Sequence, residues 1–146
     1  MEPTVLAEIR AIMRGGRPTK PRRDEEFGLQ RFVIDSLRLF GVPGIVSFHV
    51  NNGSKLSKRA AARAKAMGVL PGVADIVVVG PLPNVWFLEL KSSTGRLSDA
   101  QEVFRDAVVA LGWEYRVAST PEAACNVLLQ WGVLREDPLK RAGEGA

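Results

Sequence analysis

The sequence predicts an α/β domain in which a mixed β-sheet is flanked by helices, and three observations support this prediction. First, two apolar runs, 75–79 and 85–91, are separated by the turn sequence GPLPN at 80–84, which is typical of a β-hairpin. Second, a strand, a helix and a strand are expected across 85–118, and such a unit normally makes a right-handed parallel crossover. Third, the remaining apolar segments have helical spacing and begin at capping residues, so helices should cover the sheet.

Each expected helix begins at a capping side chain and stops at a glycine. The four helices begin at Asp24, Ser57, Ser98 and Thr120 and stop at Gly41, Gly68, Gly112 and Gly132. The expected strands between them are 45–50, 75–79, 85–91 and 113–118. Apolar faces are assigned to the first helix (Phe27, Val33, Ile34, Leu37, Phe40) and to the third (Phe104, Val108, Leu111). The resulting order is α-β-α-β-β-α-β-α, with no internal repeat.

We expect a single folded domain over 24–134, because 146 residues is close to the commonest domain size. Hydrophobic residues make up 46% of the chain and charged residues 25%, which is an ordinary globular composition and argues against wholesale disorder. Residues 1–23 are predicted to be a basic, partly flexible N-terminal arm with a short helix over 4–14. Residues 135–146 are predicted to be a flexible polar tail.

The single cysteine, Cys125, excludes an intramolecular disulfide and a cysteine-rich metal site. No apolar run approaches the roughly 18 residues that a membrane span needs, and the N-terminus lacks the pattern of a signal peptide. We therefore expect a soluble, cytoplasmic protein with no membrane partner.

Positive charge is concentrated in two segments of a chain whose net charge is +4. Residues 14–23 and 55–65 each contain five cations and no anion. One such segment is commonly just a solvated face, but two together favour a surface that binds phosphates. We expect contacts with the DNA backbone from Lys55, Lys58, Arg59 and Arg63.

The predicted hairpin brings two carboxylates together. If the turn 80–84 is symmetric, Val79 pairs with Val85 and Asp75 lies opposite Glu89. Directly opposed side chains of antiparallel strands share one face, with their Cβ atoms about 5 Å apart, and like charges placed there repel each other. A positive group is therefore expected between them.

Lys91 can supply that charge, because it is two residues past Glu89 and so points to the same face. Two carboxylates with open coordination positions suit Mg²⁺ or Mn²⁺, and a nearby ammonium suits phosphodiester hydrolysis. The alternative interpretation is that Asp75, Glu89 and Lys91 are solvated charges at strand ends. Spacing alone does not decide between the two.

The segments "GVLPGVADIVVV" and "FLELKSSTGRLSDAQ" contain Asp75, thirteen further residues and then Glu89-Leu90-Lys91. With the helical pattern Glu26-x-x-x-Gln30, this text resembles the PD-(D/E)xK nuclease superfamily, and more closely the VRR-NUC family of virus-type replication and repair nucleases. The resemblance covers about residues 24–120. The proline that usually precedes the family's aspartate is replaced here by Ala74, which alters the backbone without removing a ligand.

The resemblance implies a restriction-endonuclease-like αβββαβ core. It also implies that Asp75, Glu89 and the main-chain carbonyl of Leu90 are metal ligands and that Lys91 is the catalytic lysine. By the same resemblance, Gln101 and Glu26 are additional active-site residues.

Several of these residues also have simpler interpretations. Gln101 can close a capping box with Ser98, and Glu26 can complement the dipole of its helix. Glu25 could substitute for Glu26, and Arg105, one turn after Gln101, would face the same way and could contact a phosphate. The only histidine, His49, is expected to have a structural role on its strand. Trp86, Trp113 and Trp131 are assigned to the core rather than to base stacking.

The function expected from the sequence is that of a Mg²⁺-dependent DNA endonuclease, with Mn²⁺ as a substitute metal. Relatives of this compact architecture suggest selectivity for branched or Holliday-junction DNA in replication, repair or recombination, and action as a homodimer. The alternatives are a non-catalytic DNA-binding module on a nuclease fold, and a sequence-specific restriction-type nuclease. The glycines form no phosphate-binding loop, so no nucleotide cofactor is expected.

Overall fold

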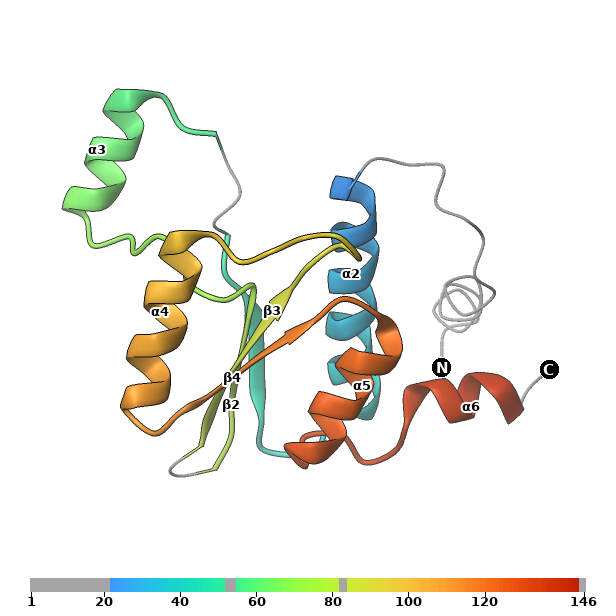
Figure 1. The fold of residues 1–146 in the computed structure, drawn as a ribbon. Helices are drawn as coiled ribbons and strands as arrows, with labels where there is room; N and C mark the ends of the chain where they lie inside the picture. The colour runs from blue at the N-terminus through green and yellow to red at the C-terminus, as the bar shows by residue number, and fades with distance from the viewer. Residues whose placement is uncertain (1–21, 52–54, 82–83, 145–146) are drawn as a thin grey trace.

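The computed structural model describes residues 22–51, 55–81 and 84–144 (Figure 1). Its strands are β1 (Val46–His49), β2 (Ile76–Val79), β3 (Val85–Leu90) and β4 (Glu114–Ala118). Its helices are α2 (Arg22–Phe40), α3 (Lys58–Ala66), α4 (Asp99–Ala110), α5 (Pro121–Gln130) and α6 (Pro138–Glu144). The strands form one sheet in the order β1-β2-β3-β4. The predicted α/β fold with a mixed sheet is confirmed.

The hairpin register is the one predicted from the turn. Val79 pairs with Val85, and Ile76, the first residue of β2, pairs with Leu88 in antiparallel strands. β1 also pairs with β2 in the antiparallel sense, whereas β3 and β4 are parallel and are connected through α4. The parallel crossover expected across 85–118 is therefore confirmed.

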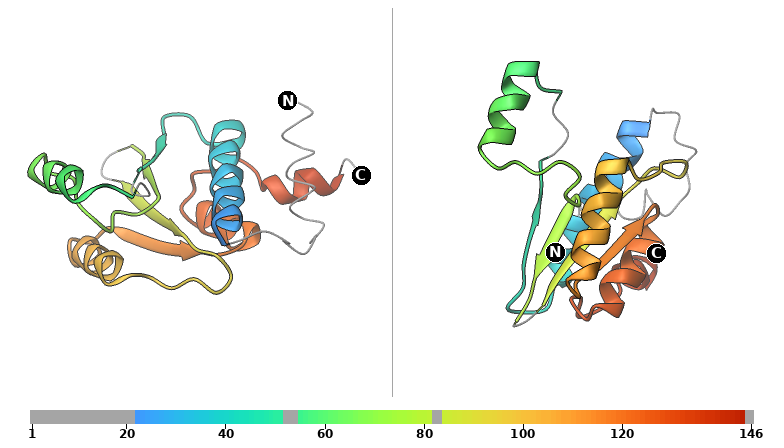
Figure 2. Two further views of the ribbon diagram at one scale, coloured as in Figure 1. Left: turned by 90° about the horizontal axis from the view of Figure 1, so that it is seen from above. Right: turned by 60° about the vertical axis from the view of Figure 1, so that its left-hand side comes forward.

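The two faces of the sheet are covered by different helices, as the two views in Figure 2 show. α2 and α5 pack on one face, where the main core joins residues of both helices to residues of β2 and β3. Members of this core include Phe32, Val33, Leu37, Phe40, Ile76, Val78, Leu88, Leu90 and Leu128. α4 packs on the other face, where Phe104 makes edge contacts with Phe87 (5.3 Å between ring centroids) and Tyr115 (6.2 Å).

Three of the four predicted caps are confirmed. The side chains of Ser57, Ser98 and Thr120 each accept a hydrogen bond from the backbone N–H three residues later. The fourth prediction is wrong, because α2 begins at Arg22 and Asp24 lies inside its first turn. The predicted core positions of the tryptophans are consistent with the stacking of Trp86 on Trp131, at 6.0 Å.

Two predicted core residues are exposed instead. Phe27 is 65% exposed, because the buried side of α2 runs through Leu29, Phe32 and Val33. Leu111 is 75% exposed, because it follows the last residue of α4, where the chain turns at Gly112 toward β4. Both predictions came from helical spacing alone, which does not define where the covered face ends.

The C-terminal segment differs from the predicted flexible tail 135–146. Residues 138–144 form α6, and Pro138 and Ala142 are buried against the rest of the domain. Residues 1–21 of the predicted arm lie outside the part of the chain that the structure describes, as do the turn residues Asn52 and Gly53. None of the described helices is long and apolar enough to cross a membrane.

α3 stands away from the rest of the molecule in all three views (Figures 1 and 2). None of its residues is buried. The chain returns from α3 to the sheet through Gly72, which has a φ of +84° and lies so close to α4 that a Cβ atom would collide with the carbonyl of Ala100. This close approach places the entry to β2 beside the start of α4.

Candidate functional site

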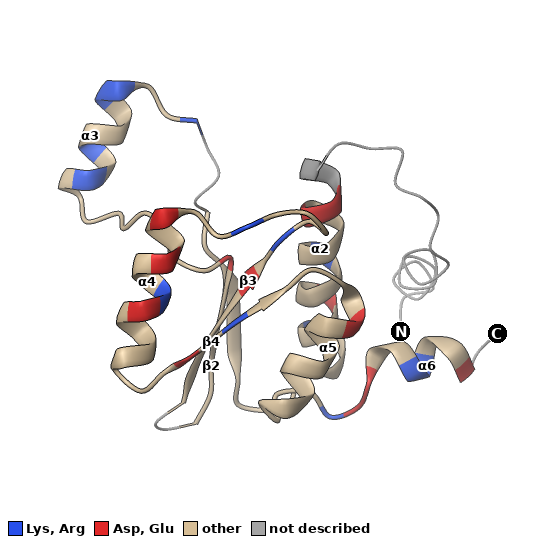
Figure 3. Cartoon of the chain, viewed as in Figure 1, with Lys and Arg blue, Asp and Glu red and all other residues tan. Residues whose placement is uncertain are grey.

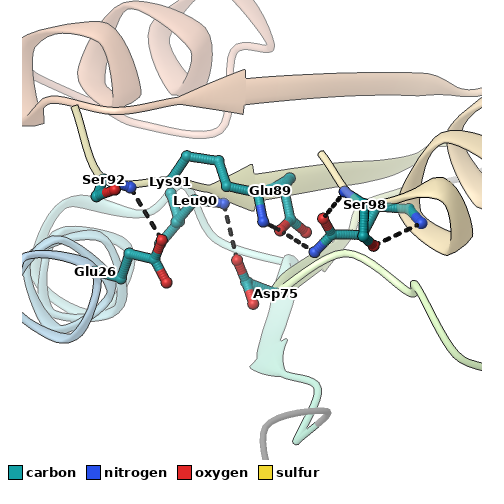
Figure 4. A network of polar contacts seen from close by, with 8 residues as sticks. Glu26, Asp75, Glu89, Leu90, Lys91, Ser92 and Ser98 are labelled. Carbon is teal, nitrogen blue, oxygen red and sulfur yellow. Dashed lines mark hydrogen bonds and ion pairs between the residues drawn. The ribbon is translucent and has the colours of Figure 1, made fainter. Parts of the chain in front are cut away.

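The hairpin register brings Asp75 and Glu89 to one face of the sheet. Asp75 directly precedes Ile76, which pairs with Leu88, so continuing the register by one residue sets Asp75 opposite Glu89. The charge of Asp75 is also the second largest cause of a raised pKa at Glu89, after burial. The predicted juxtaposition of the two carboxylates is thus present, at the end of the hairpin beside the first turn of α4 (Figure 4).

Glu89 carries a buried carboxylate, and one of its two oxygens is contacted by both an ammonium and an amide group. Its side chain is 1% exposed, and Oε1 accepts from the Lys91 Nζ at 3.0 Å and from the Gln101 Nε2 at 2.6 Å. The other oxygen, Oε2, is buried and has no partner of hydrogen-bond geometry among the described residues. The backbone N–H of Asp75 is near enough to this carboxylate to lower its pKa, but this is the smallest of the effects on it. A buried carboxylate oxygen without a donor is costly, so this atom is suited to receive a ligand.

Gln101 has both of the roles that its sequence context allows. Its Oε1 accepts from the Ser98 backbone N–H at 2.8 Å, which completes the predicted capping box, while its Nε2 donates to Glu89. The cap therefore holds the amide in the orientation that presents its donor to the carboxylate. The two interpretations weighed from the sequence are compatible.

Asp75 is hydrogen-bonded to residues of both neighbouring strands, β3 and β1. Its Oδ2 accepts from the Leu90 backbone N–H at 2.9 Å, and its main-chain carbonyl accepts from the His49 Nδ1 at 2.8 Å. In a strand, the N–H and the carbonyl of one residue lie on the same side. The Leu90 carbonyl therefore faces the Asp75 side of β3, as a shared ligand set requires.

The start of α2 binds the chain that follows β3. Glu26 Oε1 accepts from the Ser92 backbone N–H at 3.0 Å, and Glu25 Oε2 accepts from the Ser93 N–H at 3.4 Å. Glu26 lies close enough to Asp75 for its charge to contribute to the raised pKa of that residue. These contacts join positions more than 60 residues apart, and no local sequence pattern predicts them.

Burial dominates the electrostatics of the site. It raises the pKa of Asp75, and it raises the pKa of Glu89 to about 7, where the neighbouring charge of Asp75 adds to the effect. Burial also raises the pKa of Tyr115, with Glu89 as the next cause, and the Tyr115 hydroxyl has no hydrogen-bond partner among the described residues. Without a bound cation, the site therefore tends to keep a proton near neutral pH.

The donor set fits a hard divalent cation. Among the described residues, no group of three or more His, Cys, Asp and Glu side chains is placed to hold a metal. Mg²⁺ does not need such a group, because it is usually held by one or two carboxylates together with water and substrate phosphates. Asp75, Glu89 with its unpartnered Oε2, and the Leu90 carbonyl match that pattern.

The predicted DNA-contacting cations lie on a different part of the molecule from the carboxylates. Lys58, Arg59 and Arg63 are exposed on α3 and Lys55 just before it, and none forms an ion pair with another described residue (Figure 3). Arg105 is engaged with acidic neighbours, since its Nε lies 2.9 Å from Asp106 Oδ1. The structure brings the predicted catalytic residues together, whereas the basic residues form a separate surface.

The raised pKa of Glu89 predicts a pH-dependent stability. Because the folded protein binds this proton more tightly than the unfolded chain, the stability is full below about pH 4.5 and falls as pH rises through about 7. In EDTA at pH 8, the free energy of unfolding of Glu89→Gln should therefore exceed that of wild type by roughly 1–3 kcal/mol. The variant should accordingly unfold at a higher denaturant concentration. Glu102→Gln, an exposed carboxylate on α4, serves as the control and should keep the wild-type pH profile. Parallel profiles for Glu89→Gln and wild type would contradict the assignment.

Comparison with known proteins identifies the fold. No family model matches the sequence, and no curated protein matches it. A solved structure described as a "VRR_NUC domain protein" superimposes with a TM-score of 0.58 and 20% sequence identity, covering 73% of this chain and 86% of that one. The chain therefore has the fold of a VRR-NUC domain, with the carboxylate site at the end of its hairpin.

Proposed function

We propose that this chain is a metal-dependent DNA endonuclease whose active site comprises Asp75, Glu89 and Lys91. The observation that carries the proposal is the buried Glu89, which has one oxygen held by Lys91 and Gln101 and the other without a partner. Such an arrangement is unfavourable for folding and is explained by a cation at the site. The similarity of the fold to a VRR-NUC domain supports the same activity.

Asp75, Glu89 and the Leu90 carbonyl would hold Mg²⁺, and Mn²⁺ should substitute for it. When bound, the metal would polarise a phosphodiester and lower the pKa of a coordinated water. The chain's own contribution is to fix the ligands. The Leu90 N–H orients Asp75, and Gln101 and Lys91 hold Glu89 Oε1 so that Oε2 remains available.

Lys91 would act on the reacting phosphate. Its side chain is 13% exposed and lies on the same face as both carboxylates, where its ammonium can orient a nucleophile or offset charge that develops on the phosphate. Glu26 would act as a positioning residue, because it binds the Ser92 N–H directly after Lys91. It thereby fixes the backbone that carries the lysine.

α3 would bind the DNA backbone. Its cations are exposed and paired with no other described residue, so phosphate contacts would cost no existing ion pair. Such contacts position a duplex without reading its sequence, which favours an enzyme selective for structure, for example for branched or Holliday-junction DNA. A homodimer with two symmetric sites would cut two strands.

Loss of the metal ligand or the lysine should abolish cleavage. Asp75→Asn and Lys91→Ala are each expected to lower Mg²⁺-dependent cutting of junction, flap and duplex DNA by at least about 100-fold. Binding to the same DNA in EDTA should change little, because neither residue belongs to the basic surface. Asp106→Asn and Lys140→Ala remove exposed charges of the same kind and should cut normally. A wild-type chain that binds DNA but never cuts it, with Mg²⁺ or Mn²⁺, would instead be a DNA-binding module.

The two roles of Gln101 can be separated with Ser98. Ser98→Ala removes a cap, and Gln101→Ala removes the reciprocal capping bond together with the donor to Glu89. Both variants should lose up to about 1 kcal/mol of stability in urea unfolding. Only Gln101→Ala should also reduce the cleavage rate, because only it releases Glu89. Equal rates for the two variants would limit Gln101 to capping.

The basic surface should account for much of the salt dependence of duplex binding. Each phosphate contact contributes about 0.9 to the slope of log K against log salt concentration. The triple variant Lys58→Ala/Arg59→Ala/Arg63→Ala is therefore expected to lower that slope by about 2 to 3, measured by fluorescence anisotropy. The variant Arg116→Ala/Lys140→Ala/Arg141→Ala removes the same charge elsewhere and should retain the slope. Equal slopes for both triple variants would place duplex binding outside α3.

A further inference from the structure

The hydroxyl group of Tyr115 is buried on the same face of the sheet as the carboxylate site. Tyr115 lies on β4 and pairs with Phe87 of β3 in the parallel register. It packs with Phe87 and Phe104 beneath α4, where the rings of Tyr115 and Phe104 are 6.2 Å apart between centroids. Phe87 and Glu89 are two residues apart on β3, so their side chains share this face. Tyr115 and Glu89 therefore point to the same side of the sheet.

The register places Tyr115 within reach of Glu89. Neighbouring strands are about 4.8 Å apart and two residues along a strand advance about 6.6 Å, so the Cα atoms of Tyr115 and Glu89 are about 8 Å apart. Aromatic and long side chains can contact each other across such diagonal positions. The negative charges of Glu89 and Asp75 are also the next causes, after burial, of the raised pKa of Tyr115. The hydroxyl is therefore directed toward the carboxylate end of the sheet.

Tyr115 and Glu89 each have one buried polar atom without a partner. The Tyr115 hydroxyl and the Glu89 Oε2 atom make no hydrogen bond of acceptable geometry with another described residue. Tyr115 is 8% exposed and Glu89 is 1% exposed, so bulk solvent does not satisfy either atom. The hydroxyl can donate a hydrogen bond, whereas an ionised carboxylate oxygen can only accept one. The two groups are therefore complementary, because each supplies what the other lacks.

We propose that Tyr115 is a positioning residue of the carboxylate site and that its hydroxyl acts on Glu89 Oε2 through one buried water molecule. The hydroxyl would donate to the water, and the water would donate to Oε2. Buried water molecules commonly bridge polar groups that have no protein partner. A carboxylate oxygen has two lone pairs, so accepting from the water leaves one for a cation. This inference rests on the proposed function only for the identity of Glu89 as a metal ligand.

The water-mediated contact would complete the orientation of the Glu89 carboxylate. Lys91 and Gln101 hold Oε1, and Tyr115 would fix the other oxygen from β4. Groups that orient a metal ligand without touching the metal typically change metal affinity by roughly 10–100-fold when they are lost. Tyr115→Phe removes only the hydroxyl oxygen and keeps the ring that packs on Phe104. The variant should therefore weaken metal binding while the packing beneath α4 is preserved.

The first test observes the hydroxyl directly, because Tyr115 is the only tyrosine of the chain. Protein labelled with ¹³C at the tyrosine ring carbon that bears the hydroxyl gives one NMR signal, whose position depends on the hydrogen bonding of that group. In EDTA at pH 8, Glu89→Leu removes the acceptor and should move this signal by more than its line width. Ser36→Ala removes another buried hydroxyl without a partner, on α2 and so on the other face of the sheet, and should leave the signal in place.

The second test is a double-mutant cycle measured by urea unfolding in EDTA at pH 8. In the wild-type background, Tyr115→Phe should increase the equilibrium constant for unfolding by at least about 5-fold, because it leaves the ionised Glu89 without its bridged donor. In the Glu89→Leu background, the same replacement should increase the constant by less than about 2-fold, because no acceptor remains to be lost. Ser36→Ala should have the same effect in both backgrounds.

The third measurement is Mn²⁺ binding to the full chain without DNA, by isothermal titration calorimetry. Tyr115→Phe is expected to bind Mn²⁺ at least about 5-fold more weakly than wild type, and Ser36→Ala is expected to bind it equally well. Additive effects in the cycle, a ¹³C signal that Glu89→Leu does not move, or equal Mn²⁺ affinities for wild type and Tyr115→Phe would overturn the role of Tyr115. Coupling of Tyr115 to Glu89 in a wild-type chain that binds no Mn²⁺ would retain their contact and reject the metal site of the proposed nuclease.

Discussion

The burial of one carboxylate, that of Glu89, is the constraint on which the site depends. A charged side chain at 1% exposure is unfavourable unless its oxygens have partners, and here only one oxygen does. Lys91 and Gln101 come from two different elements to satisfy it. The unsatisfied oxygen and the proton affinity of the site follow from the same burial. Folding stability is thereby reduced at the position where a ligand would be bound.

The surrounding elements hold this carboxylate from several directions. β2 brings Asp75 opposite it, the capping box of α4 aims Gln101 at it, and Glu26 of α2 fixes the backbone after Lys91. Each contact is made by a strand or helix that also contributes to the packing or hydrogen bonding of the fold. The geometry of the site is therefore a consequence of the hairpin register and of two helix N-termini.

The sequence was sufficient to predict contacts set by local rules. The symmetric five-residue turn determined the register of β2 and β3, and hence the common face of Asp75 and Glu89. Ser98 and Gln101 were predicted as a capping box, although the simultaneous bond to Glu89 depends on how α4 docks on the sheet. The bond of Glu26 to Ser92, the exposure of Phe27 and the packing of α6 depend on tertiary placement, which periodicity does not encode.

The detachment of α3 from the core has an evolutionary consequence. Since none of its residues is buried, substitutions there are not constrained by packing and should have little effect on the free energy of unfolding. Charge on this helix can be gained or lost without compensating changes in the interior. Homologous chains are thus free to vary the charge of one peripheral segment while the carboxylate geometry at the hairpin stays the same.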